Sequence, residues 1–205
     1  MTVREALQRA IRPSTTRSIA ALWAKSLLNA LLFFGVFVLA LPALAHRLLP
    51  RELPLPRGPR AWLAGVLALA GIAAWLGCLD TFSRHGRGTP LPADAPRQLV
   101  TGGLFGRMRN PIMASELLVI WGVVLYLASV GVILYAVAIS LGAHLAVVHV
   151  EEPELRKRFG ERYEAYCRSV PRWLPRIRKP RQVDTAGTTR APGGRTRFPG
   201  RRGGT

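Results

Sequence analysis

Two adjacent carboxylates, Glu151 and Glu152, end the longest uncharged stretch of the chain. From residue 117 to residue 150 there is no Asp, Glu, Lys or Arg. Two acids at the carboxyl end of a helix oppose its dipole unless a cationic or hydrogen-bonding group meets them. That group is either a structural arginine or a ligand, and the pair is therefore the first candidate for chemistry.

His144 is the polar group that precedes this pair within the same stretch. It lies seven residues before Glu151, so in a regular α-helix both side chains project along one face. An ionisable group inside a membrane helix usually points into the bundle and marks a function. We expect His144 to line a polar pocket, the alternative being a packing histidine whose hydrogen bonds are satisfied.

Arg109, Asn110 and Pro111 stand just before the same uncharged stretch. Pro111 suits the first position of a helix and Asn110 the capping position before it. Free amides at such a helix start, with Arg109 beside them, make an anion site for a carboxylate or phosphate. If the stretch is a hairpin, this site and the two glutamates lie together. Opposite charges would then face one small volume, as a zwitterionic, amino-acid-like ligand requires.

The elements that must position these groups are apolar helices. The uncharged stretch exceeds one bilayer crossing of ~20 residues, and residues 112–150 fit two helices folded back on each other near Ala128, Ser129 and Gly131. The earlier runs 26–45 and 61–79 each match one crossing. The sequence predicts an all-α, polytopic membrane helical bundle with about four transmembrane helices and a C-terminal helical hairpin.

The segment that follows the glutamates is amphipathic. Leu155, Phe159, Tyr163 and Tyr166 fall on one side of a helix that starts near Pro153 and lies in the cytoplasm. Residues 170–175 predict an ordered, extended segment with Trp173 as an interfacial anchor. We expect a basic N-terminal segment at 1–18, a membrane domain at 19–178 and a disordered Arg/Gly-rich tail at 179–205.

The net charge of +18 first suggests a polyanionic partner. Helices that must lie in a bilayer are incompatible with the exposed basic face that nucleic acid needs, so we expect no nucleic-acid role. We expect anionic lipid headgroups to meet the basic loops and tail. The positive-inside rule and an even number of crossings place both termini in the cytoplasm, with the protein in the plasma (inner) membrane. Loop 46–60, with four arginines, opposes this bias. The two cysteines have no spacing that predicts a metal site.

Three blocks of the sequence together resemble a known family. They are GxGTPxP at residues 86–92, LVxxGxxxxxRNP at 99–111, and EEPxLxxxFGxxYxxYxxxVPRWxP at 151–175. This order resembles the bacterial branch of the isoprenylcysteine carboxyl methyltransferase and phospholipid methyltransferase superfamily. The resemblance implies an integral membrane enzyme that transfers a methyl group from S-adenosylmethionine to a lipid-like acceptor without a Rossmann domain.

The resemblance also implies which residues form the cofactor site. By position they are Arg109, Asn110, Pro111, His144, Glu151 and Glu152. Arg109 and His144 are the candidates for a catalytic role. The chain departs from many relatives at Asn110, Met113 and Ser115, where they have histidine, tyrosine and glycine.

The resulting hypothesis is methyl transfer to the carboxylate of a prenylated cysteine-like group or to an amine headgroup. A carboxylate acceptor needs no base, whereas an amine must lose a proton, for which His144 is the nearest recipient. Two alternatives remain open. One is an NADPH-dependent membrane reductase of related fold, although the glutamate pair would repel the 2′-phosphate. The other is a non-catalytic membrane adaptor with a basic tail.

Overall fold

The chain folds into a bundle of long helices, and the computed structural model describes residues 16, 18–86, 89 and 96–176. Helix α2 (Ile19–Phe33), the π-helix η1 (Phe34–Ala40) and α3 (Leu41–Leu48) form the first rod. The second is α4 (Arg57–Thr81) with η2 (Phe82–Gly86). After the short helix η4 (Gly103–Gly106) come α5 (Pro111–Leu127), α6 (Val130–Ala146), η5 (Val147–Glu151), α7 (Glu152–Phe159) and α8 (Glu161–Ser169). Within the described ranges there is no β-strand.

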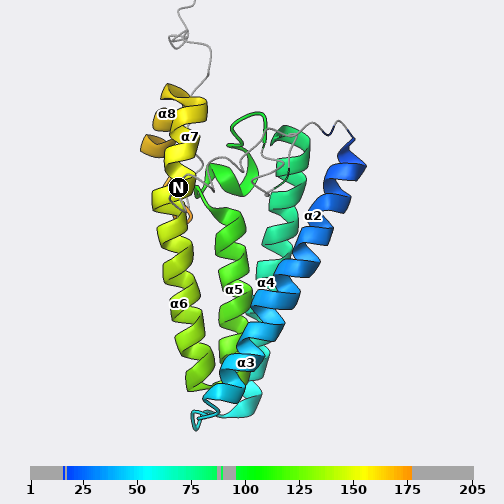
Figure 1. Ribbon diagram of the computed structural model, residues 1–205, viewed down its shortest axis with the longest axis vertical. Coiled ribbons are helices and arrows are strands. Elements are labelled where there is room, and N and C mark those ends of the chain that lie inside the picture. The colour runs from blue at the N-terminus through cyan, green and yellow to red at the C-terminus, as the bar shows by residue number, and fades with distance from the viewer. Residues whose placement is uncertain (1–15, 17, 87–88, 90–95, 177–205) are drawn as a thin grey trace, which may run out of the picture.

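The predicted all-α membrane bundle is confirmed. In Figure 1 the long helices lie side by side, with α7 and α8 at the end where α5 begins. Three rods have 30 residues, Ile19–Leu48, Arg57–Gly86 and Val130–Phe159, and are apolar enough to cross a bilayer. Helix α5 has 17 residues, or about 25 Å, the lower limit for a crossing. Only 17% of the most apolar window of the first rod is buried, so its apolar side chains face outwards, as lipid requires.

The first helix begins seven residues before the predicted run, at Ile19. The hydroxyl of Ser18 caps it by accepting from the amide of Ala21 at 3.4 Å. Lys25 does not end the helix, because its long side chain is exposed and donates to Thr16. Apart from residues 16 and 18, the basic segment 1–18 lies outside the described residues, as does the tail 179–205.

Helices α4 and α5 pack closely because glycines remove side chains from their interface. A Cβ atom on Gly71 would lie 2.8 Å from the carbonyl oxygen of Ser115 and 2.7 Å from Cγ2 of Val119. On the other helix, a Cβ atom on Gly122 would lie 3.1 Å from the carbonyl oxygen of Ala64. Small residues let membrane helices approach in this way. The close pair fixes the start of α5 beside the end of α4.

The predicted hairpin turn between α5 and α6 is confirmed. Ala128 closes α5 in the left-handed conformation, with φ of 46°, and α6 starts two residues later. The hydroxyl of Ser129 donates to the carbonyl of Leu49 at 3.2 Å. Gly131 touches the carbonyl oxygen of Ala45, which leaves no space for a side chain. The turn is therefore held against the end of α3.

Two π-helical turns precede the prolines Pro42 and Pro153. The amide of Leu41 bonds to the carbonyl of Val36, and the amide of Glu152 to that of Val147, each five residues back. A proline ring clashes with the carbonyl four residues earlier in a regular α-helix, and a widened turn relieves that clash. Both rods therefore continue past their prolines.

This continuity corrects the predicted break at the glutamate pair. The helix does not end at Glu151; it runs unbroken from Val130 to Phe159. It ends at Gly160, whose φ of 52° few other residues adopt. The predicted amphipathic helix is therefore two helices, α7 and α8. Its apolar side chains still meet, because Leu155, Phe159, Tyr163 and Tyr166 pack in one cluster.

Candidate functional site

Helix α5 starts as predicted, with Asn110 as the capping residue and Pro111 in its first turn. The side chain of Asn110 does not cap the helix, however. Its amide donates to the carbonyl of Arg172 at 3.2 Å, and its backbone amide donates to the same oxygen at 3.3 Å. The backbone amide of Arg109 donates to the carbonyl of Pro171 at 2.8 Å. These two amides are therefore not free for an anion.

The partner of this helix start is the segment 170–176, which we call the strap. It follows α8 as an irregular chain and returns to the beginning of α5. Its last amide, that of Arg176, donates to the carbonyl of Arg107 at 3.0 Å. The sequence predicts an ordered, extended strap. The strap connects the end of α8 to the residues on either side of Arg109 in the chain, Arg107 and Asn110.

Glu152 is the centre of an arginine cluster formed with Arg109, Arg156 and Arg172. The residue is only 2% exposed. Its Oε1 accepts from Arg172 Nε at 2.6 Å and pairs with Arg109 Nη1 at 3.0 Å. Its Oε2 accepts from Arg172 Nη2 at 3.0 Å and lies 3.6 Å from Arg156 Nη2. A buried carboxylate needs such partners, and the hydrogen bond to Glu152 also raises the pKa of the Arg172 guanidinium.

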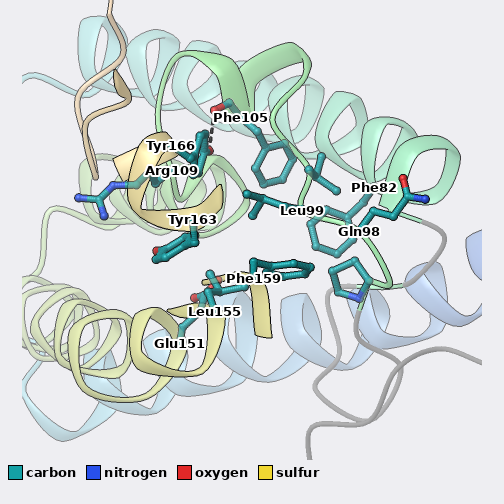
Figure 2. Close-up of a pocket in the computed structure, with 12 residues that line it drawn as sticks. Phe82, Gln98, Leu99, Phe105, Arg109, Glu151, Leu155, Phe159, Tyr163 and Tyr166 are labelled. Carbon is teal, nitrogen blue, oxygen red and sulfur yellow. Dashed lines mark hydrogen bonds between the residues drawn. The ribbon is translucent and has the colours of Figure 1, made fainter. Parts of the chain in front are cut away.

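Glu151 has different surroundings from its neighbour. It is exposed, lines a pocket together with Arg109, and forms no ion pair with any residue that the structure describes. Figure 2 shows Tyr163, Tyr166 and Arg109 along one side of this pocket and Phe82, Gln98 and Leu99 along the other. The remaining lining residues are Pro96, Val100, Phe105, Leu155 and Phe159. The wall is mainly aromatic and aliphatic, with one unpaired carboxylate.

His144 lies outside the lining of this pocket. Its Nδ1 accepts a hydrogen bond from Trp173 Nε1 at 3.0 Å, so Trp173 contacts the helix instead of serving only as an interfacial anchor. The prediction that His144 and Glu151 share a face is wrong, because the π turn between them adds one residue to the turn. Glu152 now shares that face, and it meets Arg172, the neighbour of Trp173.

Two tyrosines fix the inner wall of the pocket. The hydroxyl of Tyr166 donates to the carbonyl of Phe105 at 2.6 Å. Burial raises the pKa of both the Tyr163 and Tyr166 hydroxyls above their ordinary range. Both therefore stay neutral donors at physiological pH, and neither is a base.

Groups of opposite charge, Arg109 and Glu151, line the pocket. Glu151 offers carboxylate oxygens to a cation, and aromatic rings attract cations as well. Nε of Arg109 is buried without a hydrogen-bond partner among the described residues, so it is a donor that a carboxylate could use. The cavity is small, however, at about 50 Å³. Sites for small molecules usually have several hundred Å³, so side chains must move to admit a whole cofactor.

Sequence reasoning assigned no role to several residues of the site, among them Arg156, Arg172 and Cys167. Arg172 lies in the block 151–175, and its place in an ordered, proline-bounded segment is a signal for a structural role. The thiol of Cys167 accepts from Arg109 Nη1 at 2.9 Å. No spacing pattern could have found this contact, because 58 residues separate the two.

The comparison with protein families agrees with this architecture. No curated protein matches the chain. The sequence model described as phospholipid methyltransferase matches residues 60–162, half of the chain. The matched range begins in the first turn of α4, includes the hairpin and the arginine cluster up to Arg156, and ends in α8. The chain therefore belongs to the phospholipid methyltransferase family and is an integral membrane methyltransferase for lipid-like substrates.

Proposed function

We propose that this protein transfers a methyl group from S-adenosylmethionine to a lipid-like acceptor at the pocket between α7, α8 and the start of α5. The observation that carries the proposal is the placement of Arg109 and Glu151 on one aromatic-lined cavity. When bound, the cofactor supplies a methyl group on a positively charged sulfur. A pocket with aromatic rings and an unpaired carboxylate favours such a cation.

Different residues would bind different groups of the cofactor. Glu151 would hold its ammonium group or ribose hydroxyls, and the free Nε of Arg109 would donate to its carboxylate. Asn110 and Pro111 would set the direction of Arg109 by fixing the start of α5. Glu152 would act through the arginines that surround it.

The chemistry needs little more than position and exclusion of water. Methyl transfer proceeds by in-line attack, and holding the two reactants together supplies much of the rate. An acceptor with an apolar tail would reach the pocket from the lipid. An amine acceptor must also lose a proton, and His144 could take it only after its Nδ1 gives up the hydrogen bond from Trp173.

We further propose that the protein lies in the plasma membrane and that its pocket faces the cytoplasm. The described part of the chain has many arginines at this end, among them Arg84, Arg107, Arg156 and Arg158. Cytoplasmic loops carry such an excess, and anionic headgroups attract it. Accessibility labelling of a cysteine introduced at Arg107 from either side of sealed vesicles tests this orientation.

Calorimetry on the detergent-purified protein tests the cofactor. S-Adenosylhomocysteine should bind with a dissociation constant near micromolar, on the order of −8 kcal/mol. Glu151→Gln and Arg109→Ala should weaken binding at least about tenfold, whereas Glu161→Gln, an exposed acid on α8, should not. Absence of binding would refute the proposal. Tight NADPH binding instead would favour a reductase, and binding of neither would favour an adaptor.

Labelled cofactor identifies the acceptor class. Membranes that contain the protein are incubated with radiolabelled S-adenosylmethionine, and the labelled lipid is extracted. Label released by mild base indicates a methyl ester and hence a carboxylate acceptor. Label that resists base indicates nitrogen, and labelled lipid equal to that of membranes without the protein would contradict methyl transfer.

A further inference from the structure

We propose that Arg172 is a positioning residue: it orients Glu152, and Glu152 in turn orients Arg109 at the pocket. This inference rests on the proposed function, because the group to be positioned is the one that would hold the cofactor. It assigns a role to the strap, which otherwise contributes no side chain to the pocket lining.

Arg172 and Arg109 share one oxygen atom of Glu152. Oε1 of Glu152 contacts Arg172 Nε at 2.6 Å and Arg109 Nη1 at 3.0 Å. Arg172 also reaches Oε2 at 3.0 Å, so it holds both oxygens and fixes the plane of the carboxylate. Two parallel hydrogen bonds of this kind give geometric specificity as well as energy. The direction of Arg109 therefore depends on Arg172 although the two guanidinium groups need not touch.

The backbone of Arg172 also contacts the start of α5. The carbonyl of Arg172 accepts from both the backbone amide and the side-chain amide of Asn110. Arg172 thus binds Asn110, the residue before α5, with its main chain. With its side chain it binds Glu152, the first residue of α7. It joins the two ends of the hairpin at the level of Arg109.

The carboxylate oxygens of Glu152 are already occupied by arginines. With 2% exposure and three arginines around it, its oxygens are occupied, and a ligand ammonium would have to displace a guanidinium to reach them. Glu151 lines the pocket and forms no ion pair with a described residue. The two acids therefore have separate tasks: Glu151 faces the ligand, and Glu152 orients Arg109.

Arg156 does not share this role to the same degree. It is 44% exposed, lies 3.6 Å from Glu152 and pairs more closely with Glu164, at 2.8 Å. An exposed ion pair contributes little. Arg172, with 32% exposure and the shorter contacts, is the arginine of the cluster that determines the geometry of the carboxylate.

A double-mutant cycle read by S-adenosylhomocysteine binding tests the proposal. Arg172→Ala should raise the dissociation constant about tenfold in the wild-type background but less than about twofold in the Arg109→Ala background. Arg172→Lys, which keeps the charge but cannot hold both oxygens, should lie between, and it covers the case in which Arg172→Ala does not fold. Arg176→Ala, a strap arginine that does not touch Glu152, is the matched control and should bind as the wild type. Equal losses in both backgrounds would overturn the proposal.

The thiol of Cys167 gives a second readout that needs no cofactor. Its Sγ touches Arg109 Nη1, so its rate of alkylation by N-ethylmaleimide reports the position of that guanidinium. In a Cys78→Ala background, Arg172→Ala should change the rate in the same direction as Arg109→Ala. A rate equal to that of Arg176→Ala would overturn the proposal. If the wild type binds no S-adenosylhomocysteine, the proposed function fails, while the thiol comparison still decides whether Arg172 positions Arg109.

Discussion

The indole of Trp173 donates a hydrogen bond to Nδ1 of His144 at 3.0 Å, which joins the strap to α6. An imidazole that accepts at Nδ1 carries its proton on Nε2 when neutral. The histidine is thereby held in one tautomer, and the strap is attached to the membrane helix as well as to α5.

Loss of this hydrogen bond should measurably destabilise the protein. Trp173→Phe removes the donor but keeps an aromatic ring, and a hydrogen bond contributes about 1 kcal/mol net. The thermal midpoint in detergent should fall by about 2–4 °C for a chain of this size. Trp62→Phe, at an exposed apolar position of α4, should leave the midpoint unchanged. Equal midpoints for Trp173→Phe and wild type would show that the contact is not made in solution.

The two neighbouring glutamates should differ in their effect on stability. Glu152→Gln leaves Arg109 and Arg172 without their shared counter-charge, and breaking a buried pair costs on the order of 3 kcal/mol. Glu151→Gln should change the free energy of unfolding by less than about 0.5 kcal/mol, as at other exposed positions. Thermal unfolding of both variants at one detergent concentration makes the comparison. Similar midpoints would contradict the division of tasks between them.

The hydroxyl of Tyr166 predicts a loss of stability at high pH. Burial raises its pKa in the folded protein above the ordinary value of about 10. The unfolded state therefore loses its proton first as pH rises. The stabilisation is complete below pH of about 10 and is lost as pH rises from there towards the folded pKa. Thermal midpoints between pH 8 and 11 should decline less steeply for Tyr166→Phe than for wild type. Tyr126→Phe, at an exposed position, should decline as the wild type does.

The glycine contact between α4 and α5 should tolerate no added methyl group. In Gly71→Ala the new Cβ atom would meet the backbone oxygen of Ser115 at 2.8 Å, so the helices must separate at a cost of about 1–3 kcal/mol. Gly65→Ala and Gly77→Ala, on the same helix with nothing within 4 Å, are matched controls. They should leave the midpoint equal or slightly higher, because alanine favours the helix. A stable Gly71→Ala variant would show that the two helices are less tightly packed than described.

Local patterns in the sequence predicted much of the fold. Uncharged runs identified the four rods, and the small residues near Ala128 marked the hairpin turn, because both depend on neighbouring residues alone. Asn110 and Pro111 marked the start of α5 for the same reason. The nearness of Arg109 to the glutamates followed from the topology of a hairpin, and the 3.0 Å contact with Glu152 agrees with it.

The remaining parts of the site depend on contacts between distant residues or on irregular helix geometry. Arg172 reaches Glu152 across 20 residues, and its carbonyl binds Asn110 across 62. No periodicity encodes such pairs. The assumption of a regular α-helix assigned His144 and Glu151 to one face, and a single π turn made that assignment wrong.

That π turn also sets the direction of everything beyond it. One residue corresponds to about 100° of rotation around a helix axis, so the extra residue in η5 turns α7 by roughly that angle about the line of α6. Leu155 and Phe159 thereby face the pocket, although α6 keeps its leucines towards the lipid. This one turn thus separates a lipid-facing half of the rod from a ligand-facing half. Deleting Val148 would rotate the second half around the helix axis relative to the first.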